Sequence, residues 1–175
     1  MFQFQETEID GVLLIIPQRF EDERGCFYET YVQEAMAKKG IDFPFLQMNR
    51  SVSRKGVLRG LHYQIPPQAK LVSVAKGRVF DVAVDLRQGS PTRGHHVHAV
   101  LDDLEGHMLY IPEGFAHGFL VLSEEAVFSY LCSVPYCPEG NRGVRWDDPE
   151  LAIPWPEKPK LLSKKDGALP FFQEL

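Results

Sequence analysis

The segment from Val57 to Lys70 carries the side chains of this sequence that are best suited to chemistry. It reads VLRGLHYQIPPQAK and places a guanidinium, an imidazole and an amide within six residues, at Arg59, His62 and Gln64. Arginine can bind a phosphate through two parallel hydrogen bonds, and histidine can exchange protons near neutral pH. The ammonium of Lys70 can stabilise a negative charge that develops during a reaction. The segment therefore predicts a site for an anionic substrate and proton-transfer chemistry.

Two further polar stretches each leave two interpretations open. Residues 22–29, DERGCFYE, alternate aromatic with charged side chains around a glycine. Such a stretch is usually a solvated turn, yet Arg24 and Glu29 could clamp a polar ligand. From Gln47 the chain reads QMNRSVS, so Gln47, Asn49 and two serines point to one strand face. Four polar side chains in a row suit either solvent or a polar ligand.

His117 ends a Pro-x-Gly-x-x-His run that resembles the second sequence motif of cupins, which are small double-sheet jelly rolls. In metal-binding cupins this histidine is a ligand, and the first motif adds two histidines and a glutamate. Here the corresponding region offers only His62 and Gln64, followed by Gln68 and Lys70. An ammonium repels a nearby cation, so Lys70 argues against a metal. His117 is then either a core histidine bonded to the backbone or a functional residue.

Three histidines lie close together in the sequence, at His95, His96 and His98. His96 and His98 share a strand face, and such a pair can chelate a metal. No cysteine or carboxylate is near enough to complete a local site, and the preceding SPTRG is typical of a surface turn. We therefore interpret them as exposed strand histidines.

Length and composition restrict the class of protein. The chain has 175 residues, so we expect one domain, residues 1–175, with a hydrophobic core. Hydrophobic residues make up 44% and charged residues 25%, as in soluble globular proteins. The net charge of −5 argues against a nucleic-acid partner, so the cations near Arg59 would serve a small anion.

Cysteine usage and the N-terminal residues bear on localisation. The three cysteines, Cys26, Cys132 and Cys137, form no CxxC pair, and their odd number argues against a disulfide framework. The first residues have neither the basic nor the apolar region of a signal peptide. No apolar run approaches the roughly 18 residues of a membrane span. We expect a cytoplasmic protein without membrane contact.

The pattern of apolar residues predicts an almost entirely β structure. One short helix is expected from Tyr31 to Lys39, because Gly40 follows and lysines occupy its last turn. Turns rich in Gly, Pro, Ser and Asp separate the other elements, which indicates a sandwich or barrel. The expected strands are residues 11–16, 71–74, 78–86, 97–101, 107–111, 118–122 and 126–132. The proline-rich last third is expected to run as an extended arm over the barrel.

Two predictions concern which face of a strand a side chain occupies. Asp81 and Asp85 share one face of the strand at residues 78–86, which we interpret as a solvated face, with a wet barrel interior as the alternative. Arg59 and His62 are three residues apart, so a regular strand would direct them to opposite faces. A bulge at Gly60 would bring both to one face, and we assume that bulge here.

The motifs in their order identify a resemblance to the dTDP-4-dehydrorhamnose 3,5-epimerases, a family of sugar-nucleotide epimerases. The resemblance covers essentially the whole chain and depends on many specific motifs. The matching pieces are Asp22-Glu-Arg-Gly-x-Phe27, Gln47-x-Asn49-x-Ser51, Gly56 to Gln64, Lys70-Leu-Val72, Asp81 to Arg87, Ile111 to Phe119, Trp146-x-Asp148-Pro149 and Ser163-Lys-Lys-Asp166.

The resemblance implies a cupin-like double-sheet jelly roll and a homodimer. It also implies a dTDP-linked 4-keto-6-deoxy-hexose as substrate, with no metal and no cofactor. The reaction would invert C3 and C5 of dTDP-4-dehydro-6-deoxy-D-glucose through an enolate. Because the keto group is already present, no nicotinamide is needed, and the sequence has no G-x-G-x-x-G fingerprint.

The resemblance further assigns roles to residues of this chain. His62 would be the general base, Tyr130 the acid on the opposite face of the sugar, and Asp166 the residue that orients His62. Lys70 would hydrogen-bond the C4 oxygen as it becomes an enolate. The implied substrate-binding residues are Arg24, Glu29, Gln47, Asn49, Arg59, His117, Tyr136 and Lys165, with Arg24 and Arg59 on the pyrophosphate and Arg24 and Glu29 reaching a neighbouring subunit's site.

Three residues depart from what is common among the relatives. Leu131 follows Tyr130 where many have Lys, Asn141 replaces a frequent Glu, and Met48 replaces a frequent Asp. These changes bear on the substrate and on which carbons react, so an epimerase acting at C3 only or C5 only is the alternative. Two other classes remain: a metal-dependent cupin enzyme that uses the histidines, and a sugar-nucleotide binding module without catalysis.

Overall fold

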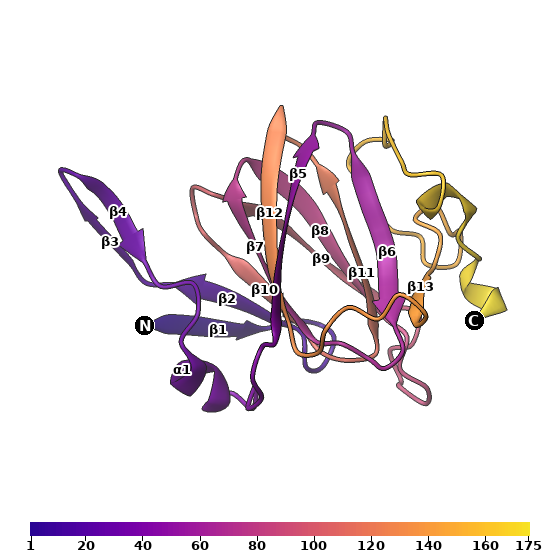
Figure 1. Ribbon diagram of the computed structural model, residues 1–175, viewed down its shortest axis with the longest axis horizontal. Coiled ribbons are helices and arrows are strands. Elements are labelled where there is room, and N and C mark those ends of the chain that lie inside the picture. The colour runs from indigo at the N-terminus through magenta and orange to yellow at the C-terminus, as the bar shows by residue number, and fades with distance from the viewer.

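Two antiparallel sheets face each other and enclose the main hydrophobic core. The computed structural model describes all residues, 1–175. The six-stranded sheet, in spatial order, consists of β1 (Phe2–Glu6), β2 (Leu13–Pro17), β10 (Met108–Ile111), β7 (Lys70–Lys76), β12 (Glu125–Cys132) and β5 (Gln47–Arg54). The five-stranded sheet consists of β13 (Asn141–Gly143), β6 (Leu58–Gln64), β11 (Phe115–Val121), β8 (Arg78–Asp85) and β9 (His96–Asp102). Figure 1 shows the two sheets as layers, with the N-terminal strands and the C-terminal segment at opposite sides.

This architecture confirms the predicted all-β jelly roll. Each expected strand is present, with its ends shifted by at most a few residues. The predicted helix is shorter than expected, because α1 covers only Gln33–Ala37 and packs through Met36. Of the strands in these two sheets, β1 and β13 were not anticipated. No helix is long and apolar enough to cross a membrane.

The core between the sheets is built from alternate residues of facing strands. Val72 and Val74 of β7 meet Val79 and Ala83 of β8, and Phe128 lies fully buried among them. The inward face of β8 therefore includes Asp81 and Asp85, which are both completely buried. The prediction of a solvated face for these two aspartates was wrong, because both faces of β8 are covered.

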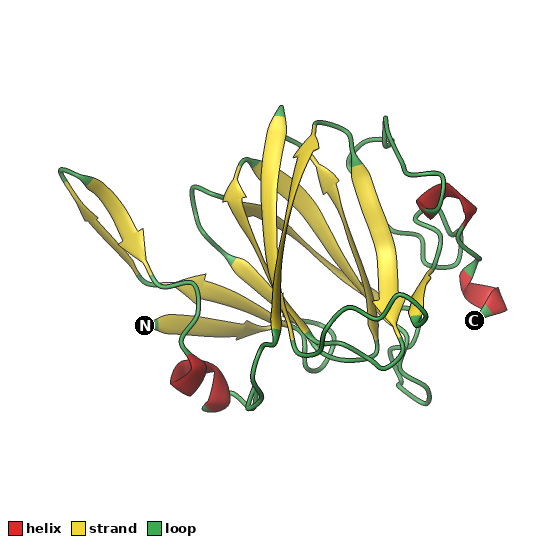
Figure 2. Cartoon of the chain, in the orientation of Figure 1, coloured by secondary structure: helices red, strands yellow, loops and turns green.

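The outward face of the five-stranded sheet is covered by the C-terminal arm. Leu151 and Phe172 pack against Leu58, Val82 and other apolar residues of this sheet. The arm holds only two short 3₁₀ helices, η1 (Asp166–Ala168) and η2 (Phe172–Glu174), and is otherwise loop, as Figure 2 shows. The predicted extended arm is thus confirmed.

A two-stranded hairpin projects from the body of the molecule. Strands β3 (Arg19–Asp22) and β4 (Gly25–Tyr28) pair only with each other and extend beyond the sheets, as Figure 1 shows. The sequence 22–29, for which a solvated turn and a ligand clamp were both left open above, contains the tip and the second strand of this hairpin. Phe20 and Phe27 on the hairpin are half or more exposed.

Asp148 fixes the C-terminal arm to the body. Its carboxylate is buried and accepts three backbone hydrogen bonds, from Glu150 (2.8 Å), Leu151 (3.1 Å) and Phe172 (2.7 Å). The two oxygens thus join residues that are more than twenty positions apart. Asp147, its neighbour, is exposed and pairs with Arg145 at 2.7 Å.

We expect Asp148→Ala to lower the free energy of unfolding by about 3 kcal/mol, because three backbone N–H groups, two of them in buried hydrogen bonds, would lose their acceptor. Urea denaturation measures the change. Asp147→Ala is the control and should cost less than about 1 kcal/mol, since it removes only a surface ion pair. Equal losses in the two variants would contradict this role for Asp148.

Candidate active site

A polar cavity lies between the two sheets, and a second cavity continues from it. The first has a volume of about 340 Å³ and is lined by Ser51, Arg59, His62, Lys70, His117, Phe119, Phe128, Tyr130, Asn141, Ser163, Lys165 and Asp166. The second, of about 330 Å³, is lined by Gln47, Asn49, His62, Tyr63, Gln64, Gln68, Lys70, Tyr130, Tyr136 and Asn141. The two cavities share His62, Lys70, Tyr130 and Asn141, so together they form one elongated site.

A bulge in β6 brings Arg59 and His62 to the same cavity. His62 lies opposite His117 of β11, whereas Arg59 lies opposite Phe119, so β6 has one residue more than β11 over this stretch. Gly60 has a φ of +125°, a conformation that side chains disfavour. A Cβ at this position would lie 2.6 Å from Cα of Gly118. The bulge assumed from the sequence is therefore confirmed, and only glycine fits it.

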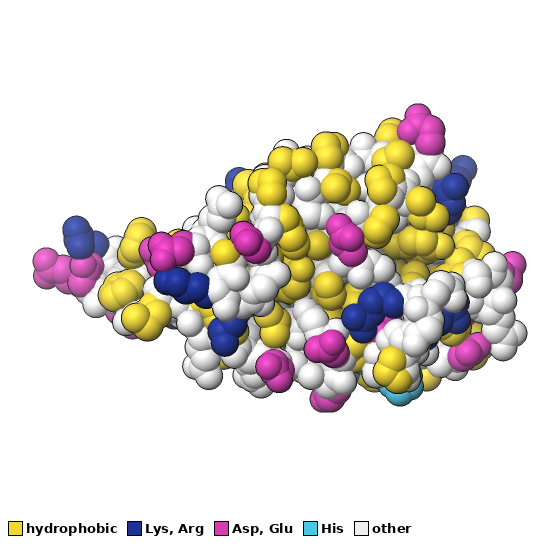
Figure 3. All heavy atoms as spheres, turned by 90° about the horizontal axis from the view of Figure 1, so that it is seen from below, with side chains coloured by type: hydrophobic (Ala, Val, Ile, Leu, Met, Phe, Trp, Pro, Cys, Tyr) yellow, Lys and Arg dark blue, Asp and Glu magenta, His cyan; other side chains and the backbone are white.

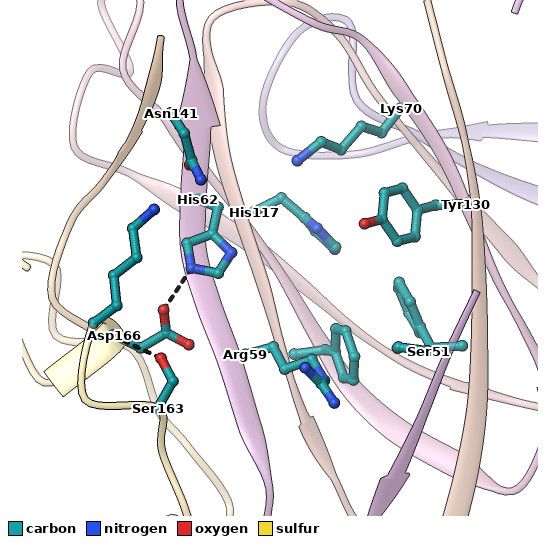
Figure 4. Close-up of a pocket in the computed structure, with 12 residues that line it drawn as sticks. Ser51, Arg59, His62, Lys70, His117, Tyr130, Asn141, Ser163 and Asp166 are labelled. Atoms are coloured by element: carbon teal, nitrogen blue, oxygen red, sulfur yellow. Dashed lines mark hydrogen bonds and ion pairs between the residues drawn. The ribbon is translucent and has the colours of Figure 1, made fainter. Parts of the chain in front are cut away.

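His62 is hydrogen-bonded to Asp166, a residue supplied by the C-terminal arm. Its Nε2 lies 2.7 Å from Oδ1 of Asp166, and Figure 4 shows the other ring nitrogen turned toward the cavity. Burial favours the neutral form of Asp166. The hydrogen bond and charge of His62, with the N–H of Gly60 and the Ser163 side chain, outweigh burial and lower its pKa below the ordinary value. An ionised Asp166 therefore accepts a hydrogen bond from Nε2–H, which leaves Nδ1 of neutral His62 free to accept a proton.

Tyr130 faces His62 from the opposite sheet. It lies on β12, and its hydroxyl points into the cavity in Figure 4. Burial raises the pKa of Tyr130, and the nearby Cys132 adds to the increase, while Arg59 opposes it. The phenol is therefore protonated at neutral pH and can donate its proton.

Lys70 directs its ammonium into the same cavity from the first residue of β7, as Figure 4 shows. Burial lowers the pKa of Lys70, and the charges of Cys132 and Asp81 oppose that decrease. An imidazole, a phenol and an amine from three different strands thus converge on one space.

Of the two interpretations of His117, a core histidine bonded to the backbone does not hold, because its partner is a side chain. Its ring is buried, and Nε2 lies 2.9 Å from Oδ2 of Asp81. It also lines the cavity beside Phe128, on which its ring stacks at 5.8 Å. The sequence could have indicated this pair, because Asp81 alternates with the apolar residues Val79 and Ala83 on the inward face.

The second cavity is organised by a chain of hydrogen bonds. The backbone N–H of Tyr136 donates to Oε1 of Gln47 (2.8 Å), and Nε2 of Gln47 donates to Oδ1 of Asn49 (2.8 Å). Nδ2 of Asn141 donates to the hydroxyl of Tyr136 (2.9 Å). The polar face predicted for β5 is therefore turned toward this site and not toward bulk solvent.

Two predicted site residues lie away from both cavities within the chain. Arg24 is at the hairpin tip, where it pairs with Asp22 at 2.5 Å, and Glu29 pairs with the terminal ammonium of Met1 at 3.0 Å. Lys165, in contrast, lines the first cavity. Sequence reasoning did not assign a site role to Ser163, whose hydroxyl accepts the N–H of Asp166 at 3.0 Å. Its place in the Ser-Lys-Lys-Asp motif was the available signal.

The three neighbouring histidines lie at the start of β9, where the rings of His96 and His98 are 5.7 Å apart. His95 and His98 are exposed as predicted, but His96 is half-buried, which corrects the interpretation for that residue. His98 stacks on Phe80 at 5.0 Å. The structure contains no group of three or more His, Cys, Asp or Glu side chains arranged to hold a metal ion.

The family model and the curated relatives that match this chain carry the same family name. The sequence model described as dTDP-4-dehydrorhamnose 3,5-epimerase matches residues 6–174. A curated protein of that name from Methanothermobacter thermautotrophicus is 46% identical over 169 residues, covering 94% of this chain and 91% of the relative.

Solved structures of similar proteins show the same fold. The dTDP-6-deoxy-D-glucose-3,5-epimerase from Legionella pneumophila, in complex with dTDP-4-keto-L-rhamnose, is 46% identical with a TM-score of 0.95, covering 98% of this chain and 93% of that one. A 3'-monoepimerase from Streptomyces bikiniensis, in complex with dTDP-quinovose, is 37% identical with a TM-score of 0.89, covering 94% and 85%. The second likeness shows that the fold also occurs in an epimerase acting at one carbon.

We expect Gly60→Ala to destabilise the protein and displace His62, because the added Cβ would collide with the backbone of β11. The control is Gly89→Ala: Gly89 also has a positive φ, of +75°, but a Cβ there meets nothing within 4 Å. Urea unfolding should show a loss larger by about 2 kcal/mol for Gly60→Ala than for Gly89→Ala. Similar losses would mean that the close approach at Gly60 is not required.

Proposed function

The chain belongs to the dTDP-4-dehydrorhamnose 3,5-epimerase family of isomerases, and from that premise we propose its specific reaction. The proposed substrate is dTDP-4-dehydro-6-deoxy-D-glucose, and inversion at C3 and C5 gives dTDP-4-dehydro-L-rhamnose. The observation that carries the proposal is the meeting of His62, Tyr130 and Lys70 in one cavity, with His62 held by Asp166 at 2.7 Å.

The proposed reaction begins with removal of a proton beside the ketone. Nδ1 of His62 takes the proton from the carbon, and the electron pair of the C–H bond moves to the C4 oxygen to form an enolate. Lys70 stabilises that oxygen with its ammonium. The carbonyl makes the neighbouring C–H acidic, so this mechanism calls for neither a metal nor a cofactor. Asp166 stabilises the imidazolium and keeps its ring in place.

Inversion follows when a proton returns to the opposite face of the carbon. Tyr130 lies across the cavity from His62 and is protonated, because burial raises its pKa. It donates its proton to the enolate carbon, and the C4 ketone re-forms. The proton on His62 and the phenolate of Tyr130 then exchange with solvent. The same cycle at the second carbon completes the reaction.

Binding of the nucleotide is proposed to extend along both cavities. Arg59 donates through Nε to the hydroxyl of Ser53 at 2.9 Å, which leaves its terminal nitrogens for the pyrophosphate. Gln47, Asn49, Tyr136, Lys165 and His117 line the remainder and are proposed as substrate-binding residues. A C3-only or C5-only epimerase is the second candidate, because the fold is shared with a 3'-monoepimerase.

Incubation with dTDP-4-dehydro-6-deoxy-D-glucose in deuterated water tests the reaction. The proposal predicts deuterium at C3 and at C5, which NMR detects in the product. Label at a single carbon would support the second candidate. Absence of label at both would refute epimerisation of this substrate.

Single variants test the assigned base and acid. We expect His62→Asn and Tyr130→Phe each to reduce kcat by ~10²–10⁴-fold, because each removes one proton-transfer group. His95→Asn is the matched control, since His95 is exposed and outside the cavities, and should retain wild-type kcat. Binding of dTDP, measured by calorimetry, should persist in all three. A protein that binds dTDP but shows no turnover in any form would be a binding module.

We also propose a homodimer in which the hairpin of one protomer contacts its partner. The hairpin carries exposed Phe20 and Phe27, with charged side chains at its tip, and Figure 3 shows the projecting tip with hydrophobic side chains behind the charges. The outer face of β5 likewise exposes Met48 and Val52, at 60% and 59%. Exposed apolar surface of this kind typically marks a contact site. A partner protomer would bring Arg24 to a site that it does not reach within its own chain.

We expect Phe27→Asp to shift the protein from dimer to monomer in sedimentation velocity, because a carboxylate would be buried at the contact. Leu104→Asp is the control: Leu104 is 72% exposed on a different loop, so this variant should remain dimeric. A wild-type protein that sediments as a monomer would contradict the proposed assembly.

A further inference from the structure

Gln64 is a buried amide at the end of β6 to which the proposed mechanism gives no role. The residue is only 7% exposed, and both ends of its amide are engaged by the loop at 133–140, which joins β12 to β13. Nε2 donates to the carbonyl of Pro135 at 3.2 Å, and Oε1 accepts the backbone N–H of Cys137 at 3.2 Å. A buried polar group whose hydrogen bonds are all made rigidifies its surroundings. The two bonds flank a single residue, Tyr136.

The backbone of Gln64 holds the other end of the same loop. In the antiparallel pair of β6 and β13, which Figure 1 shows side by side, Gln64 lies opposite Asn141. The N–H of Ile65, its neighbour, donates to the carbonyl of Gly140 at 3.0 Å. The hydrogen bond from Asn141 to the hydroxyl of Tyr136, at 2.9 Å, joins the two ends of the loop. Gln64 therefore registers both partners of that bond.

Tyr136 is held at its backbone and at its hydroxyl, while its ring has no stacking partner. Its N–H donates to Oε1 of Gln47 at 2.8 Å, and the residue lines the second cavity. It is 54% exposed, and its ring contacts no other aromatic ring of the protein. A ring that is fixed in this way can serve as a platform for a planar base, and such stacking typically contributes about 5- to 150-fold in affinity.

We propose that Gln64 is a positioning residue that fixes Tyr136 as the stacking platform for the base of the nucleotide. The identity of the ligand rests on the proposed function, whereas the hold of Gln64 on Tyr136 does not. His62, the proposed proton acceptor, lies two residues before Gln64 on the same strand. Strand β6 would thus set the separation between the reacting sugar and the nucleotide base.

The same loop offers a matched control for the test. Oγ of Ser133 accepts the N–H of Ala69 at 2.9 Å, so Ser133→Ala also removes a hydrogen bond that holds the loop. Ser133 is as buried as Gln64, at 8% exposure, but lines neither cavity. Gln64→Met keeps the length of the side chain and removes both of its hydrogen bonds. A general loosening of the loop would appear in both variants.

The ligand-free measurement follows the ring of Tyr136 by ¹⁹F NMR in protein labelled with 3-fluorotyrosine, with its signal assigned by Tyr136→Phe. Gln64→Met should shift or broaden this signal, because the ring would then occupy more than one position. Ser133→Ala should leave the signal as in the wild type. An unchanged Tyr136 signal in Gln64→Met would overturn the proposal.

Calorimetry measures the consequence for binding. Gln64→Met should weaken the binding of dTDP about tenfold, within the range expected for one stacked base. Inorganic pyrophosphate has no base and should bind as in the wild type, and Ser133→Ala should bind both ligands normally. Equal losses for dTDP and pyrophosphate would overturn the proposal. A wild-type protein without affinity for dTDP would refute the proposed function, and the ¹⁹F signal would still decide whether Gln64 holds Tyr136.

A double-mutant cycle decides whether Gln64 acts through Tyr136 or contacts the ligand itself. In Tyr136→Ala, adding Gln64→Met should change the affinity for dTDP by less than about twofold, because the platform is already absent. Losses that multiply would overturn the proposal, since Gln64 would then act without Tyr136.

Gln64→Asn is a second variant that keeps the proposal testable if Gln64→Met does not fold. It retains the amide but is one methylene shorter, so it cannot reach Pro135 and Cys137 together. It should change the Tyr136 signal and weaken dTDP in the same direction. Wild-type behaviour of Gln64→Asn in both measurements would overturn the proposal.

Kinetics with the proposed substrate separate this inference from the proposed function. Gln64→Met should raise KM about tenfold and change kcat by less than about threefold, because the lost stacking acts equally on the ground state and the transition state. A reduced kcat at wild-type KM would overturn the proposal. Absence of turnover in the wild type, with the dTDP and ¹⁹F results as expected, would refute the proposed reaction and leave the role of Gln64 standing.

Discussion

The hydrogen bond between His62 and Asp166 is the interaction on which the rest of the site depends. It joins residues that are about a hundred positions apart, at a distance of 2.7 Å. Two unrelated features must be correct for it to form. The bulge at Gly60 turns His62 to the cavity, and the C-terminal arm, fixed by Asp148, carries Asp166 to the same place. Because Asp166 lies on the C-terminal arm, that arm must be anchored for the His62–Asp166 hydrogen bond to form. Phe172 and Leu151 provide the anchor by packing on the outer face of the sheet.

Two histidine–aspartate pairs lie at the cavity. Each of two histidines on neighbouring strands, His62 and His117, is hydrogen-bonded to its own aspartate, and the two residues lie opposite each other in the β6–β11 pair. His62 is open to the cavity and His117 is buried, so the two pairs have different surroundings although their geometry is similar. The proposed proton transfer uses the first pair. The interior of a small jelly roll thus accommodates these two aspartates because each has a histidine partner.

Sequence patterns predicted most of the fold, because the alternation in the central strands is strong. They also indicated Arg59, His62 and Lys70 as chemically important, and the bulge followed from requiring Arg59 and His62 to share a face. The roles of Tyr130 and Asp166 came from the family resemblance, since nothing local in either segment marks them. The environment of Asp81 was predicted wrongly because alternation cannot tell a solvated face from one covered by a second sheet. The positions of Arg24 and Glu29, on and beside a projecting hairpin, could not be predicted either. Strands β3 and β4 pair only with each other, so no pairing with the main sheets fixes where these two residues lie relative to the cavity.

The central claim is that Asp166 holds neutral His62 with its proton on Nε2, which leaves Nδ1 facing the substrate. Nitrogen-15 NMR of histidine-labelled protein measures this tautomer directly, with the His62 signals assigned by their loss in His62→Asn. The account predicts that neutral His62 carries its proton on Nε2 in the wild type and that this preference weakens in Asp166→Asn. A proton found on Nδ1 of neutral His62 in the wild type would contradict the account, because no lone pair would then face the cavity.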